Sequence, residues 1–351
     1  MTKKTMKRLI QAAGIITDPA IGPSIAVFMN VYDKVFKRYE RPDYSLYPGL
    51  YFYDLVKDEF KRREISFQSK DVMLAGYYYE RKNPLGLVVT AHGIHSGADD
   101  YIPIQKYFYD KGFNVFSFDY RGTYSSEGDS TVGACESLFD LDQALKFIES
   151  CPIFKGLPIF LFGHSWGGYA CLGNLSIHKN IKAVASVSAM SDGHTIIIEK
   201  AKEYTGKLHY MIRPYIAVYQ RYLFKEYADY DSIKGINSCQ IPIFIAHGVD
   251  DMVINYYDQG VSGRKDKIKN PNVIFYDGIG LHGGHMDILL SDDAVIYRKE
   301  IDSKINMLKH EKKDFSLDDL REFYKTIDHK RYSNPNLDLL DSILNMFLKT
   351  L

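Results

Sequence analysis

The chain has 351 residues, enough to bury a full hydrophobic core, which favours one large domain with a smaller inserted or appended part over two independent domains. Lysine and arginine together number 44, as do aspartate and glutamate, so the balanced charge argues against a nucleic-acid partner. The four cysteines form no C-x-x-C pattern, so we expect reduced core residues of a cytoplasmic protein rather than disulfides or zinc ligands.

Residues 1–63 are interpreted as a separate helical segment. The segment begins basic and then apolar, like a signal peptide, but Asp18, Pro19 and Pro23 interrupt the apolar stretch. It is also too short and too broken to cross a membrane, which takes about 20 mainly apolar residues. We predict two short helices, the second continuing through DKVFKRYER, that pack on the core or make a peripheral contact with a membrane surface.

Residues 64–192 are predicted to form the first part of the main domain. The alternating stretches REISFQSKD and MLAGYYYER indicate a hairpin, and PLGLVVTAHG and FNVFSFDYRG indicate buried strands. Helical spacing follows in DDYIPIQKYFYDKG, with Gly112 as its stop, and in TVGACESLFDLDQALKFIES. Because strands and helices alternate after the hairpin, the sequence predicts an α/β fold with a mostly parallel, doubly wound sheet.

The stretch IFLFGHSWGGYA, residues 159–170, carries the main chemical signal. Its apolar start is typical of a parallel strand buried on both faces. Gly163, Ser165 and Gly167 then give G-x-S-x-G, the spacing of a nucleophile elbow, in which a strand turns sharply into a helix and exposes a strained serine. The other interpretation is a tight turn with an unreactive serine.

Residues 193–238 interrupt the alternation of predicted strands and helices. They are interpreted as a helical cap over the crevice at the carboxyl edge of the sheet. This segment is rich in tyrosine, and Tyr210, Met211 and Tyr215 are its candidate substrate-binding residues. An aromatic face that simply packs on the body is the alternative.

The sheet is predicted to resume in residues 239–310, where an acid and a base should follow the serine. A serine hydroxyl is a poor nucleophile until a histidine takes its proton and a carboxylate orients that histidine. Asp250 and Asp251 follow the strand IPIFIAHG, and His282 and His285 follow the strand VIFYD. The chain order serine, aspartate, histidine is the order of this kind of fold. A metal site at the two histidines lacks a third ligand, so none is predicted.

Other charged and titratable residues are given structural roles. His92, His164 and His247 stand at strand ends, where we expect hydrogen bonds to neighbouring loops. The remaining lysines and arginines are expected on the solvated surface. Residues 311–351 are interpreted as a helical extension beyond the last helix of the fold, and its leucine stripe packs back on the body or forms a homodimer contact.

Several motifs in the correct order resemble the α/β-hydrolases, in the branch of monoglyceride lipases and serine aminopeptidases. They are AHGIHSGADDY, FDYRGTYSSEG, in which Tyr124 stands where a glycine is usual, GHSWGG and HGVDD. The resemblance implies a hydrolase core with a cap and a triad of Ser165, Asp251 and His285, with His282 as the alternative base. It also implies an oxyanion hole from the backbone N–H groups of Ile94 and Trp166, and no cofactor.

The predicted activity is hydrolysis of a carboxylic ester through an acyl-enzyme. The aromatic cap favours a small-molecule substrate with an apolar acyl or aryl group, such as a short-to-medium acyl ester or a monoacylglycerol-like lipid. An aminopeptidase or amidase of the same fold is the alternative enzyme, and Glu199, Glu203 and Glu226 leave open an acidic cap for a substrate amine. A non-catalytic binding protein is the alternative outside enzymes.

Overall fold

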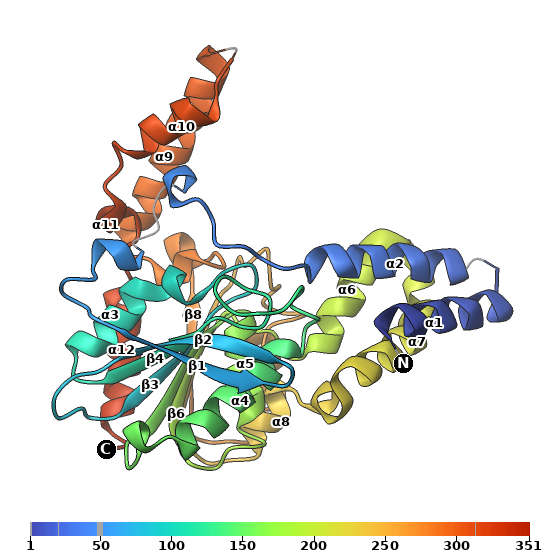
Figure 1. Ribbon diagram of the computed structural model, residues 1–351, viewed down its shortest axis with the longest axis horizontal. Helices are drawn as coiled ribbons and strands as arrows, with labels where there is room; N and C mark the ends of the chain where they lie inside the picture. The colour runs from blue at the N-terminus through green and yellow to red at the C-terminus, as the bar shows by residue number, and fades with distance from the viewer. Residues whose placement is uncertain (1, 20, 48–51, 313) are drawn as a thin grey trace.

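The computed structural model describes residues 2–19, 21–47, 52–312 and 314–351. Its centre is an eight-stranded sheet of order β1-β2-β4-β3-β5-β6-β7-β8 (Figure 1). The strands are β1 Arg63–Ser69, β2 Val72–Tyr79, β3 Leu87–Ala91, β4 Asn114–Phe118, β5 Ile159–His164, β6 Ile181–Val187, β7 Ile243–Gly248 and β8 Val273–Gly278.

The pairing of the strands confirms the predicted hairpin and the mostly parallel sheet. β1 pairs with β2, and β2 with β4, in antiparallel fashion. From β4 through β3, β5, β6, β7 and β8 each neighbouring pair is parallel. Every residue of β3, β4, β5 and β7 is buried, as is expected where helices cover both faces of a parallel sheet.

Helices cover the two faces of the sheet with separate apolar clusters. One face packs against α4 Glu136–Ser150, α5 Trp166–Asn174 and α8 Ser232–Asn237. The other packs against α3 Ile102–Asp110 and α12 Leu337–Leu348. α3 ends as predicted before Gly112, whose φ of 110° lies in the region that a glycine adopts without strain.

Two N-terminal helices, α1 Lys3–Thr17 and α2 Ile21–Val35, pack against the cap. The prediction that the second helix continues through DKVFKRYER was wrong, because α2 ends at Val35 and the chain becomes extended. Arg38 explains part of this change, since its Nη1 donates hydrogen bonds to the carbonyls of Ser126 and Gly128, each at 2.9 Å. Within the residues described, no helix is long and apolar enough to span a bilayer.

The cap consists of α6 Gly193–Thr205 and α7 His209–Phe224, and its aromatic face is largely occupied by the N-terminal helices. Tyr219 lies edge-on to Tyr32 of α2, with ring centroids 5.6 Å apart. Gln220 donates a hydrogen bond to the Tyr32 hydroxyl at 3.0 Å. The third helix of the predicted cap, α8, instead packs on α5, where a Cβ on Gly235 would lie 1.9 Å from the Leu172 carbonyl oxygen.

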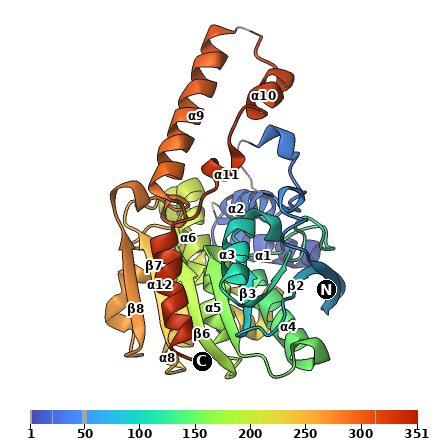
Figure 2. The same ribbon diagram turned by 90° about the vertical axis from the view of Figure 1, so that its left-hand side faces the viewer.

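The C-terminal part is divided differently from the prediction. α9 Asp292–Glu311, expected as the last helix on the sheet, projects from the body beside α10 Leu317–Tyr324 (Figures 1 and 2). After the short α11 His329–Tyr332, α12 returns and covers the sheet next to α3. The central residues of its leucine stripe, Leu340 and Leu344, are buried inside the chain and are not free for a dimer contact.

Phe347 provides a test of the role of α12. Its fully buried ring lies 4.8 Å from Phe160 of β5 and 5.7 Å from Phe108 of α3, measured between centroids. Phe347→Ala should lower the free energy of unfolding by about 3–5 kcal/mol, because it leaves a cavity at the centre of this layer. Chemical denaturation measures the loss.

The neighbouring Leu348 is the matched control, since 41% of it is exposed. Leu348→Ala should change the free energy of unfolding by less than about 0.5 kcal/mol. Equal effects of the two substitutions would contradict the packing of α12 on the sheet.

Candidate active site

Ser165 lies at the sharp turn between β5 and α5. Its backbone has φ 55° and ψ −116°, a conformation that is strained for a residue with a side chain. The flanking glycines are required by close backbone approaches: a Cβ on Gly163 would lie 2.4 Å from the Gly167 carbonyl oxygen, and one on Gly167 would lie 2.0 Å from that of Ala91. The turn therefore has the geometry of a nucleophile elbow.

His285 and Asp251 lie together at the same edge of the sheet. His285 Nδ1 is 2.6 Å from Asp251 Oδ2, whereas Asp250 is exposed and no described hydrogen bond or ion pair joins it to His285. His285 and Ser165 line one cavity, although no hydrogen bond joins their side chains among the described contacts. In unliganded sites such contacts are often loose and tighten with substrate.

Asp251 is buried yet held in its ionised form. Burial by itself raises the pKa of this carboxyl, but hydrogen bonds from His247 and His285 hold the pKa well below its usual range. Its other oxygen, Oδ1, accepts from the backbone N–H groups of Val253 and Ile254 at 2.8 and 2.9 Å. A fixed carboxylate therefore faces Nδ1 of His285 and fixes the hydrogen on that nitrogen.

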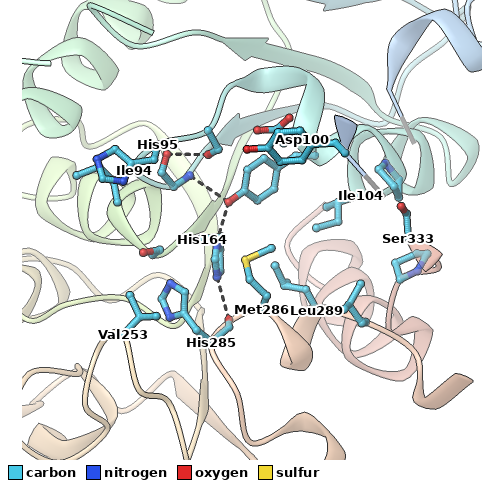
Figure 3. Close-up of a pocket in the computed structure, with 18 of the residues that line it drawn as sticks. Ile94, His95, Asp100, Ile104, His164, Val253, His285, Met286, Leu289 and Ser333 are labelled. Carbon is cyan, nitrogen blue, oxygen red and sulfur yellow. Dashed lines mark hydrogen bonds between the residues drawn. The ribbon is translucent and has the colours of Figure 1, made fainter. Parts of the chain in front are cut away.

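His164, next to the serine, links the two halves of the site. Its Nε2 donates to the His285 carbonyl at 3.1 Å, so its Nδ1 accepts from the Tyr101 hydroxyl at 2.7 Å (Figure 3). The Tyr101 oxygen in turn accepts from the Gly93 N–H at 3.0 Å. Burial lowers the pKa of His164 to about 3, so the ring stays neutral. This chain of hydrogen bonds supports the backbone of His285, the predicted base, and agrees with the structural role predicted for His164.

The predicted oxyanion donors belong to the two segments that meet at Ser165. Ile94 follows the turn after β3, and Trp166 is the first residue of α5. Among the described hydrogen bonds, neither backbone N–H donates to a protein acceptor. His92 supports the turn as expected, since its Nε2 accepts from the Tyr120 N–H at 3.1 Å and its Nδ1 lies 2.7 Å from the Gly93 carbonyl oxygen.

Two cavities meet at Ser165. The smaller, of about 270 Å³, lies between α2 and α6 and is lined by apolar side chains that include Phe28, Val31, Ile196, Ile197 and Trp166. The larger, of about 520 Å³, also contains His285 and extends to residues of α9 and α11. A ligand group bound at Ser165 therefore has space in two directions.

The predicted cap residues do not line either cavity. Tyr210 and Met211 are exposed, and the Tyr215 hydroxyl is 2.7 Å from Thr17 Oγ1 of α1. The reason is that α1 and α2 occupy the aromatic face of the cap, which leaves α6 to line the smaller cavity. The alternative base, His282, is also placed elsewhere, with Nε2 2.7 Å from Asp292 of α9.

The larger cavity holds a carboxyl group that the sequence analysis missed. Asp100 Oδ2 accepts from the Tyr124 hydroxyl at 2.7 Å and the Gly97 N–H at 3.0 Å, while the buried Oδ1 has no partner. Burial raises the pKa of Asp100 to about 7. Tyr124, which stands where a glycine is usual, has φ 38°. Its ring packs so close to Gly97 that a Cβ on Gly97 would lie 2.1 Å from the Tyr124 ring.

Among the described residues no group of three acidic, histidine or cysteine side chains could hold a metal ion.

The shifted pKa of Asp100 makes stability depend on pH. Between about pH 4 and 7 the folded state keeps a proton that the unfolded chain has lost, so this group makes the protein less stable as pH rises. Asn at position 100 cannot titrate. The free energy of unfolding of Asp100→Asn, relative to wild type, should therefore rise by about 2 kcal/mol from pH 5 to 8 in denaturation experiments.

Asp110→Asn, at the exposed end of α3, is the control for loss of a surface carboxylate. If the difference in the free energy of unfolding between Asp100→Asn and wild type does not change with pH, Asp100 is ionised as readily in the folded chain as in the unfolded one.

Comparison with known proteins agrees with this fold. A family model described as serine aminopeptidase, S33, matches residues 82–235. The uncharacterized protein YfhR of Escherichia coli O157:H7 is 23% identical over 252 residues, which cover 70% of this chain and 80% of YfhR.

Solved structures give the same result. The esterase Pf2001 of Pyrococcus furiosus aligns with a TM-score of 0.54 and 19% identity, over 79% of this chain and 98% of the esterase. Est1E of Butyrivibrio proteoclasticus, solved with ferulic acid bound, has a TM-score of 0.50 and 17% identity, over 71% of this chain and all of Est1E. The sheet and the strand-to-helix turn give the chain the α/β-hydrolase fold, which the solved esterases share, and residues 82–235 match the family model of the serine aminopeptidases.

Proposed function

We propose that the protein is a serine hydrolase that cleaves carboxylic esters through an acyl-enzyme on Ser165. The observation that carries the proposal is the strained serine at the junction of two cavities, beside a histidine that is hydrogen-bonded to a buried, ionised aspartate. This combination is costly to maintain in a turn that has only a structural role.

In the proposed first step, Ser165 Oγ attacks the ester carbonyl and His285 Nε2 takes its proton. Asp251 keeps the hydrogen of His285 on Nδ1 and stabilises the imidazolium that forms. The N–H groups of Ile94 and Trp166 donate to the oxyanion, and loss of one such donor typically costs about 100- to 1000-fold in rate. The imidazolium then gives its proton to the departing alcohol.

In the second step, water attacks the acyl-enzyme with His285 again as the base. We assign the acyl group to the smaller cavity, because its walls are almost entirely apolar. The alcohol is assigned to the larger cavity, which also reaches polar and charged side chains. Short-to-medium acyl groups or aryl groups suit the smaller cavity best.

Labelling with a fluorophosphonate probe tests the nucleophile and its base. Intact mass should show one covalent adduct on wild type, no adduct on Ser165→Ala, and at least about a 100-fold slower reaction on His285→Ala, because an unactivated serine is a poor nucleophile. His282→Ala should label at the wild-type rate, since His282 pairs with Asp292 away from the site.

Circular dichroism of each variant shows that lost labelling does not reflect lost structure. Labelling that persists in Ser165→Ala would contradict the proposed nucleophile. A folded wild type that does not label would favour the non-catalytic binding protein.

Val31 of α2 tests the assignment of the acyl group. Its side chain lines the smaller cavity, so Val31→Trp should fill the space that a longer acyl chain needs. We expect kcat/KM for p-nitrophenyl octanoate to fall by about tenfold or more, while that for the acetate changes little, as a steric effect confined to the acyl pocket requires.

Val27→Trp is the matched control, because Val27 lies one turn earlier on α2 and is 48% exposed. An octanoate-to-acetate ratio that is unchanged in Val31→Trp, or changed equally in Val27→Trp, would place the acyl group elsewhere.

A second candidate is an aminopeptidase or amidase, and Asp100 is the observation that favours it. Asp100 lines the larger cavity, and a carboxyl group there is a suitable partner for a substrate ammonium group, although its Oδ1 is buried without a hydrogen-bond partner among the described residues. The raised pKa of Asp100, about 7, weakens the case, because a protonated carboxyl attracts a cation less. Faster hydrolysis of amino-acid anilides than of esters, lost in Asp100→Asn, would favour this candidate.

A further inference from the structure

Arg298 of α9 lines the far part of the larger cavity, whereas the sequence analysis predicted that it would lie on the solvated surface. The cavity extends from Ser165 and His285 to Arg298, Tyr332 and Ser333, which belong to the C-terminal segment. In Figure 3 the side chains of Met286 and Leu289 lie between His285 and Ser333. The stretch of the cavity between its two ends is therefore lined by apolar side chains.

The guanidinium of Arg298 has no anionic partner within the described chain. Its Nε donates to the Tyr332 carbonyl at 2.9 Å, and its Cζ lies 4.5 Å from the centroid of the Tyr332 ring. No described carboxylate lies within ion-pair distance of it, and its two terminal nitrogens have no described acceptor. Asp287 and Asp302 influence it only from a greater distance.

Arg298 is half-buried, and this burial lowers the pKa of its guanidinium. Arginine stays protonated in proteins, so the cost of this environment cannot be relieved by losing a proton. A buried charge is normally paired, and pairing is most favourable when a planar carboxylate meets the two terminal nitrogens. The two terminal nitrogens of Arg298, which have no described acceptor, are therefore suited to bind an anion that enters the cavity.

The other charged group of the cavity does not supply this partner. Asp100 is directed to Tyr124 and Gly97, and Figure 3 shows Ile104 between Asp100 and Ser333. Its raised pKa also leaves it partly neutral near pH 7.

We infer that Arg298 binds a carboxylate carried on the alcohol part of the substrate, separated from the ester bond by an apolar spacer. This inference rests on the proposed function, since it concerns the alcohol that is released as the acyl-enzyme forms. The preferred substrates are esters of hydroxy acids, with the acyl group in the smaller cavity and the hydroxy acid extended past Met286 and Leu289 toward Arg298.

A structural role for Arg298 has to be separated from this binding role. Arg298 also connects α9 to α11, and its neighbour Arg331 does the same by an ion pair with Asp293 at 2.6 Å and a position 4.3 Å over the ring of Tyr297. Arg331 does not line the cavity. Arg331→Gln therefore loosens the same junction without changing the cavity, and it is the matched control.

The test uses butanoyl esters of ω-hydroxy acids with four to ten carbons, each paired with the neutral primary amide of the same acid. Wild type should favour the carboxylate over the amide by about tenfold or more in kcat/KM at one chain length, the length that reaches Arg298. Arg298→Gln should lower kcat/KM for that carboxylate by about 10- to 100-fold, mainly through KM, and leave the amide within about threefold.

Arg298→Lys should retain part of the preference because it keeps the charge, and Arg331→Gln should retain all of it. Equal rates for carboxylates and amides at every length in wild type would overturn the inference even if the Arg298 variants failed to fold. A preference that survives in Arg298→Gln would also overturn it. The proposed function fails in a different way, with no hydrolysis of any of these esters by wild type.

Discussion

The structure depends on one strained turn, in which Ser165 is held between a buried strand and a helix. Its backbone conformation costs on the order of 1–3 kcal/mol, which the surrounding packing must offset. That packing requires the absence of side chains at Gly163 and Gly167, because α5 starts in direct contact with the end of β3. The same contact brings the loop that carries Ile94 next to Ser165, so the proposed nucleophile and the proposed oxyanion donors are held together.

Neutral hydrogen bonds extend this rigidity to the base. The chain from Gly93 through Tyr101 and His164 ends on the carbonyl of His285, while Asp251 holds the other side of its ring. In contrast, both cavities extend to segments outside the sheet, the smaller to α2 and α6 and the larger to α9 and α11. The proposed chemistry thus lies at the edge of the sheet, and the proposed substrate contacts lie partly on the added helices.

The sequence predicted the sheet and the candidate residues best where local patterns determine them. Strands buried on both faces appear as apolar runs, and the glycines around Ser165 reflect steric limits within a few residues. The roles of α9 and α12 were not predictable in this way, because both are amphipathic and only tertiary packing decides which covers the sheet. Arg298 could not be distinguished from a surface arginine, since its missing partner is a property of three-dimensional surroundings.

Ser165 is the proposed nucleophile that carries the acyl group of a covalent acyl-enzyme, and trapping that intermediate tests the proposal most directly. Wild type mixed with p-nitrophenyl butanoate and quenched in acid within the first turnover should show a butanoyl mass on the peptide that contains Ser165. His285→Ala, mixed in the same way, should show at least a 100-fold slower appearance of that mass. Turnover of the ester with no acyl group on Ser165, or with the acyl group on another residue, would contradict the account.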